Sequence, residues 1–182
     1  MLVESSVVLA RGRCRGMTLI ELLVAVAVIA ILASLAVPSF VSMIENRRLK
    51  LVADTVISDM REAHTIAREL GAGGSVVMEI LSPGSGWSYT VTQTTSGDLA
   101  SRSASDFGGF VALSVTGSDF ADADSDGNRD LSMTYAAQFD ADNTGTITLT
   151  YSAKSVLITR NLGGLLSACA SDSAVGFDVC AN

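Results

Sequence analysis

The chain has 182 residues, a hydrophobic fraction of 48% and a formal net charge of -7, with a mean hydropathy of +0.42. This length suits one domain of ordinary size plus a membrane anchor. Only one apolar run is long enough to span a bilayer, which argues against a channel or a transporter. From Gly71 onward, four basic residues stand against twelve acidic ones. An acidic domain repels phosphate backbones, so nucleic acid is disfavoured as a partner.

Three arginines, Arg11, Arg13 and Arg15, immediately precede the apolar run. Basic residues that flank a first membrane span tend to stay in the cytoplasm. The pattern therefore predicts a cytoplasmic N-terminus and an exported C-terminal domain. Three basic residues, Arg47, Arg48 and Lys50, follow the run and weaken this bias.

The apolar run covers the 24 residues from Met17 to Phe40 and has few polar side chains: Thr18, Glu21, Ser34 and Ser39. A membrane-spanning helix needs about 20 apolar residues, so the run is long enough. The carboxylate at Glu21 is costly at membrane depth and is by default a functional candidate. The alternative is an ordinary anchor that tolerates a glutamate near its end.

The stretch Gly16-Met17-Thr18-Leu19-Ile20-Glu21-Leu22-Leu23 resembles the type IV prepilin signature, and Pro38 lies where such pilins commonly carry a proline. The resemblance implies that a prepilin peptidase cuts between Gly16 and Met17 and methylates the new amine of Met17. It also implies that Glu21 pairs with the N-terminal amine of a neighbouring subunit. An ammonium and a carboxylate compensate each other in low dielectric, whereas either alone is penalised.

Beyond the apolar run, the sequence predicts that the helix continues to Leu70, with Pro38 kinking or loosening it. Apolar residues recur at spacings of three and four and form one face: Leu49, Val52, Val56, Met60, Ala63, Ala67 and Leu70. The opposite face is polar: Arg47, Lys50, Asp54, Arg61 and Glu69. Gly71 is expected to end the helix. His64 is the only histidine and has no neighbouring ligand pattern, so we assign it no role.

After Gly74 the period changes to two, which is typical of antiparallel strands with one solvated face. The predicted strands are 75–81, 87–93, 110–115, 131–139, 146–151 and 155–160, the last clear one, and residues 94–109 are predicted to form a loop. The predicted fold is α+β and pilin-like: one long N-terminal helix, transmembrane in its first half and amphipathic in its second, packed on an antiparallel β head. The predicted parts are a cleaved leader (1–16), a transmembrane and assembly helix (17–40), an amphipathic periplasmic half-helix (41–71) and the β head (72–182).

Among pilin-like proteins, the head is most similar to the GspH/FimT family of pseudopilins and minor pilins. The resemblance rests on the turn Phe139–Gly145 and on the segment Ile158–Gly163, near the place where that family ends its last strand with Gly-Arg-x-Arg. Here Gly164, Leu165 and Leu166 follow instead, so the two arginines are absent. In DNA-uptake members that basic motif is the implied DNA contact. Its absence counts against a pilus-tip DNA-binding protein for natural transformation, which is the alternative function.

One acidic loop matches much of a calcium-binding loop, with its oxygen ligands at alternate positions: Asp122, Asp124, Asp126, Asn128 and Asp130. Gly127 holds the expected sixth position, but Met133 stands where the bidentate glutamate belongs. We therefore keep a solvated acidic hairpin ahead of calcium binding.

The three cysteines are Cys14, in the predicted leader, and Cys169 and Cys180 near the C-terminus. Loss of the leader leaves an even pair, which could close a small loop in an oxidising compartment. We favour this disulfide because the topology argues for export. The alternative is two unrelated free thiols.

No Ser-His-Asp or Cys-His set, phosphate loop or zinc-spaced cysteines are present in the sequence, which argues against an enzyme. The resemblance to prepilins implies a structural subunit, without catalytic residues, in a type II secretion pseudopilus or a type IV pilus. Its expected partners are other pilin or pseudopilin subunits, the prepilin peptidase and the bacterial inner membrane. It would cross that membrane once, with its head in the periplasm, before it enters the filament.

Overall fold

The computed structural model describes residues 17–81, 83–117, 120–121, 126–134, 145–160 and 165–181. Helix α1 (Leu19–Leu70) begins two residues after the predicted start and ends at the predicted residue. The chain divides into two compact units, Met1–Val41 and Ser42–Asn182, and α1 belongs to both. Pro38 lies inside α1, in the first unit.

In the second unit, α1 buries the predicted apolar stripe. Six of its seven residues are buried, and the seventh, Leu70, is partly buried. Ala53 and Ile57 widen the buried face. The single turn η1 (Gly71–Gly73) follows, and Gly71 takes a φ of 68°, a left-handed conformation that suits glycine at a helix end.

Two antiparallel sheets complete the second unit. One sheet has the strand order β3-β2-β1-β6-β5, and the other has the order β4-β7-β8-β9. The strands are β1 (Ser75–Leu81), β2 (Ser88–Gln93), β3 (Gly97–Ser103), β4 (Ala112–Gly117), β5 (Phe120–Ala121), β6 (Arg129–Thr134), β7 (Gly145–Tyr151), β8 (Lys154–Arg160) and β9 (Leu166–Ala170). The predicted α+β fold, with a long helix packed on an antiparallel head, is confirmed.

Two predictions about the strands were wrong. Residues 94–109 are not all loop, because β3 forms the edge of the first sheet there, and 155–160 is not the last strand, because β9 follows it. Strand β3 is exposed over most of its length, so it lacks the apolar alternation that marks a half-buried strand. Strand β9 (LSACA) consists mostly of small residues. The far end of the predicted strand 131–139 and the family-like turn Phe139–Gly145 fall largely outside the described residues.

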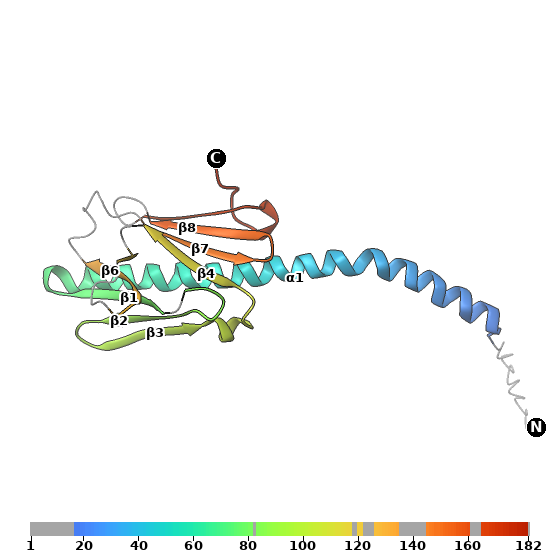
Figure 1. Ribbon diagram of the computed structural model, residues 1–182, viewed down its shortest axis with the longest axis horizontal. Helices are drawn as coiled ribbons and strands as arrows, with labels where there is room; N and C mark the ends of the chain where they lie inside the picture. Colours follow the sequence, from blue (N-terminus) through green and yellow to red (C-terminus); the bar gives the residue numbers. More distant parts are fainter. Residues whose placement is uncertain are drawn as a thin grey trace, which may run out of the picture. The chain divides into compact units, whose positions relative to one another are not determined.

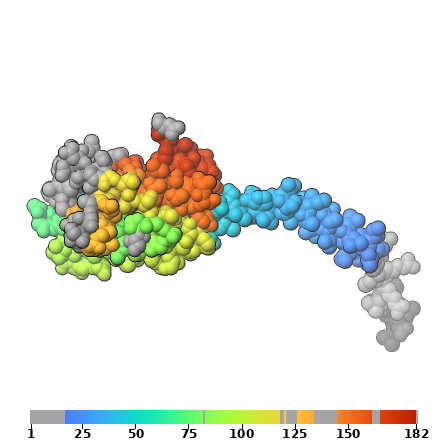
Figure 2. Space-filling model, viewed as in Figure 1, coloured from blue at the N-terminus to red at the C-terminus, as the bar shows by residue number. Residues whose placement is uncertain are grey.

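Side chains from α1 and from both sheets form one hydrophobic core. In the view of Figure 1, β1 and β2 (green) lie below α1, and β7 and β8 (orange) lie above it. The predicted inward face of the second strand is confirmed, since Trp87, Tyr89 and Val91 are all buried. In Figure 2, the orange surface of β7 and β8 adjoins the red surface of the C-terminal segment.

Candidate processing and assembly site

The first turn of α1 is capped by a side chain of the predicted motif. The backbone N–H of Glu21 donates a hydrogen bond to Oγ1 of Thr18 at 3.2 Å, and the N–H of Leu22 donates to the Thr18 carbonyl, also at 3.2 Å. The first N–H groups of a helix have no partner inside the helix, so a threonine at this position satisfies one of them. The sequence Thr18-Leu19-Ile20-Glu21 also has the spacing of a capping box.

Glu21 is exposed and lies in the first turn of α1. A carboxylate near a helix N-terminus interacts favourably with the partial positive charge of the helix dipole. The same geometry leaves the carboxylate accessible to a second positive group, as an assembly contact would require. Gly16 lies outside the described residues, and Met17, the predicted new N-terminus, is 63% exposed.

The first unit exposes nearly all of its apolar surface. From Met17 to Val41, every side chain except Ala25, which is half-buried, is exposed. By length and composition, α1 is the one helix among the described residues that is apolar enough to cross a membrane. A continuous apolar surface of this size needs a lipid or protein environment.

In the second unit, a polar cluster of two buried side chains, Asp59 and Tyr89, and the partly exposed Arg102 joins α1 to the first sheet. Oδ2 of Asp59 accepts hydrogen bonds from the Tyr89 hydroxyl at 2.8 Å and from Nε of Arg102 at 3.1 Å. Burial, and then the bond to Asp59, raise the pKa of Tyr89. The bond to Asp59 raises the pKa of Arg102. The sequence analysis missed this cluster, although Asp59 falls inside the apolar stripe, between Val56 and Met60, where a lone carboxylate needs a partner.

The described part of the acidic loop forms a small network with β1. Nδ2 of Asn128 donates to Oε1 of Glu79 at 2.6 Å and to Oδ2 of Asp126 at 2.7 Å. Asp130 lies directly opposite Glu79 in the β1–β6 register. Burial raises the pKa of Glu79; the bond from Asn128 lowers it, and the charges of Asp126 and Asp130 raise it.

The other two candidate calcium ligands, Asp122 and Asp124, lie outside the described residues. Across the part of the chain that the structure describes, no three His, Cys, Asp or Glu side chains are grouped so as to hold a metal ion. The sequence did not indicate Glu79 as a neighbour of this loop. Glu79 precedes Asn128 by 49 positions, and only the pairing of β1 with β6 brings the two together.

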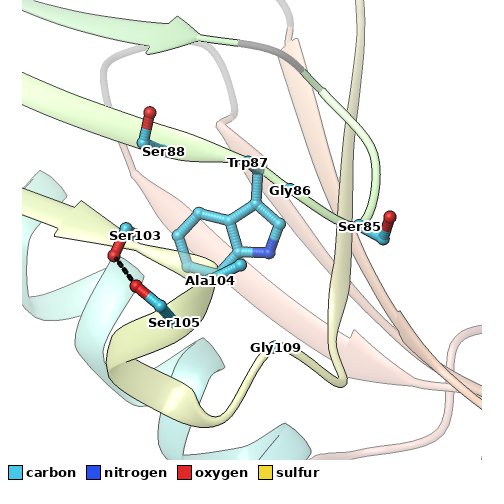
Figure 3. A pocket seen from close by; sticks show the side chains of 8 residues that line it. All are labelled: Ser85, Gly86, Trp87, Ser88, Ser103, Ala104, Ser105 and Gly109. Carbon is cyan, nitrogen blue, oxygen red and sulfur yellow. Dashed lines mark hydrogen bonds between the residues drawn. The ribbon is translucent and has the colours of Figure 1, made fainter.

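A shallow pocket of about 390 Å³ lies at the start of β2, beside the single-turn helix η2 (Ala104–Phe107). Its lining residues are all uncharged, and all except Trp87 are small (Figure 3): Ser85, Gly86, Trp87, Ser88, Ser103, Ala104, Ser105 and Gly109. The indole is 1% exposed and donates from Nε1 to the Val111 carbonyl at 2.7 Å. Trp87 therefore belongs to the core, and the pocket offers no charged group to a ligand.

The structure also describes the surroundings of His64 and the pairing of the two C-terminal cysteines. Nε2 of His64 is buried without a hydrogen-bond partner among the described residues. Burial, and then the charges of Arg68 and Arg160, lower its pKa. Cys169 and Cys180 form a disulfide.

Residues 11–37 match the family model described as the prokaryotic N-terminal methylation motif. No curated protein and no solved structure matches the chain. The matched segment contains Gly16, Met17, Thr18 and Glu21 and all of the apolar run except its last three residues, 38–40. The motif implies a type IV pilin-like protein that is processed by a prepilin peptidase and assembles with other pilins, and together with the apolar helix it supports anchoring in a membrane.

Proposed function

We propose that the chain is a minor pilin or pseudopilin, a structural subunit of a type IV pilus or of a type II secretion pseudopilus. The observation that carries the proposal is an exposed carboxylate, Glu21, in the capped first turn of a helix whose first half is otherwise apolar, within the methylation motif. An ordinary membrane anchor has no use for a charge at that depth.

In the proposed mechanism, cleavage between Gly16 and Met17 creates a free amine at the cytoplasmic end of the span. The carboxylate of Glu21 then pairs with the corresponding amine of a neighbouring subunit. Within the membrane each charge alone is costly, so pairing favours the assembled state. The arginines before the apolar run favour this orientation, with the second unit in the periplasm.

Two pairs of variants test the proposal in the native host. Glu21→Gln removes the charge and keeps the size of the side chain. We expect normal membrane insertion and a loss of at least tenfold in the amount of chain recovered in filaments. Glu45→Gln, which changes a carboxylate beyond the apolar run, is the matched control. Normal assembly of Glu21→Gln would overturn the role of this carboxylate.

Gly16→Leu tests processing. We expect mass spectrometry to show that this variant still carries the leader, residues 1–16. The control Gly12→Leu should be cut like the wild type. A Gly16→Leu chain that is still cut after residue 16 would contradict the proposed cleavage site.

The function proposed here is structural and not catalytic. DNA uptake is the alternative, and the acidic balance of the chain from Gly71 onward disfavours it. A gel-shift assay at low salt with the full chain in detergent separates the two functions. We expect no shift, and a salt-sensitive shift would favour DNA uptake.

A further inference from the structure

The C-terminal segment 171–181 folds back and is fastened at both ends to the last residues of β9. The disulfide joins Cys169 to Cys180. Two backbone hydrogen bonds flank it: Ala170 N–H donates to the Asp178 carbonyl at 2.8 Å, and Cys180 N–H donates to the Ala170 carbonyl at 3.1 Å. The segment is thus a closed loop that begins and ends beside Ala170.

The middle of this loop contacts α1. Nζ of Lys50 donates to the Gly176 carbonyl at 3.2 Å and lies 4.5 Å from the centre of the Phe177 ring. Val175, the preceding residue, is 2% exposed and belongs to the core. Lys50, which the sequence analysis placed on the polar face of the helix, therefore holds the tip of the loop through a hydrogen bond and a cation–π contact.

The tip of the loop has a glycine, Gly176, where its backbone lies against Lys50. Gly176 has a φ of 92°, which favours glycine, and a Cβ added there would lie 3.3 Å from both Cδ and Nζ of Lys50. Asp172 orders the approach to the tip, because its Oδ1 accepts from Ala174 N–H at 2.9 Å. Only the single turn η4 (Ser173–Val175) gives this segment regular structure.

We propose that this loop is a clasp on α1 that closes when the disulfide forms. A short segment with so little regular structure loses much conformational entropy on docking, and the covalent closure removes part of that cost. The Cys169 and Cys180 thiols transfer two electrons and two protons to a disulfide of an exchange partner, which becomes two thiols. Lys50 connects the loop to the helix.

The open and closed forms differ in the surface that they present. The closed clasp covers Val175 and engages the Lys50 ammonium in a hydrogen bond to the Gly176 carbonyl. The open clasp exposes Val175 and Phe177 and leaves the Lys50 ammonium to Asp54, which lies 3.7 Å away. A chain that has not been oxidised therefore presents a different helix surface, whether or not it later assembles through Glu21.

The test is amide hydrogen exchange on the full chain in detergent micelles, before and after reduction with dithiothreitol. We expect exchange in residues 171–181 to rise at least tenfold on reduction, while β1 and β2 keep their protection. Unchanged protection of 171–181 after full reduction would overturn the proposal. Because the protein is already folded when it is reduced, the test does not depend on the folding of a cysteine variant.

Substitutions at the contact between the loop and α1 distinguish a clasp from a disulfide that only crosslinks the C-terminal segment. In the oxidised protein, Lys50→Met should raise exchange in 171–181 several-fold, and Gly176→Val should do the same by displacing the tip. Lys154→Met is the matched control, since that ammonium also bonds α1, but at Asn46 and Ser42 and not at the tip of the loop. If Lys50→Met leaves the loop as protected as the control does, the helix contact plays no part and the proposal fails.

Discussion

The hydroxyl of Tyr89 on β2 donates to Oδ2 of Asp59 on α1 at 2.8 Å, and both side chains are buried. The same oxygen accepts from Arg102 on the edge strand β3. The helix and two consecutive strands of the first sheet thus meet at one carboxylate oxygen. Packing alone could tolerate sliding of the helix against the sheet, whereas this cluster defines one register.

Loss of the cluster should therefore weaken the second unit. We expect Tyr89→Phe to lower the free energy of unfolding by about 1–2 kcal/mol, since it removes a hydrogen bond to a charged group. Asp59→Ala should cost about 2–3 kcal/mol, because it leaves a buried hydroxyl and an arginine without their acceptor. Thermal and urea unfolding measure the loss of stability in each variant. The exposed Glu62→Ala is the control, and an Asp59→Ala chain as stable as this control would contradict the interpretation.

Glu79→Gln should stabilise the protein at neutral pH by about 0.2–1 kcal/mol, because it removes repulsion from a carboxylate directly across the strand pair. The substituted amide oxygen still accepts from Asn128. The pKa of Glu79 is raised in the folded state, so the folded chain binds its proton more tightly than the unfolded chain does. Stability from this group is therefore present below the unfolded pKa and is lost as pH rises through the folded pKa.

The gain from Glu79→Gln should accordingly vanish when unfolding is measured below pH 4. Glu79→Ala, which also removes the acceptor of Asn128, should not share the gain. A Glu79→Gln variant that is less stable than the wild type at pH 7 would indicate that the carboxylate has a favourable partner.

Calcium should leave the melting temperature unchanged, because the loop lacks the bidentate glutamate of a strong calcium site. The measurement is thermal unfolding in millimolar calcium and again in excess chelator. A rise with calcium that the chelator reverses would instead assign the acidic loop to the metal. In that case Glu79→Gln should reduce the rise.

His64 should make the second unit sensitive to mild acid. Its pKa is lowered in the folded state, so the folded chain prefers the neutral imidazole. The stability that this gives is present above the unfolded pKa and is lost as pH falls through the folded value. Between pH 7.5 and 5.5, unfolding of the wild type should move to lower temperature, and His64→Gln should flatten that dependence. Parallel pH profiles for the two proteins would remove His64 as the cause.

Thr18→Val should weaken the first turn of α1 while keeping nearly the same shape and volume. Loss of an N-cap costs about 1 kcal/mol. We expect reduced assembly with normal cleavage at Gly16, and Thr18→Ser should restore assembly because its hydroxyl can accept the same bond from Glu21 N–H. Equal assembly of the valine and serine variants would show that the cap is dispensable.

Local patterns predicted much of the fold. The spacing from Leu49 to Ala67 predicted the buried face of α1, and the alternation of Trp87, Tyr89 and Val91 predicted the inward face of β2. Strand β3 was missed because an exposed edge strand carries no alternation. The Asp59 cluster and the Lys50 contact depend on pairings between distant segments, which no local period encodes. The cleavage motif could be identified from the sequence because its residues are contiguous.

The environment of Trp87 makes it a built-in optical reporter. It is the only tryptophan, its ring stacks with the rings of Tyr89 and Phe107, each with a centroid 5.9 Å away, and it is shielded from solvent. Its fluorescence should therefore be blue-shifted in the native protein and move to longer wavelength only when the second unit opens. Unfolding of this unit can thus be followed in the purified chain, in detergent or in lipid vesicles, without a label and without signal from the apolar half of α1.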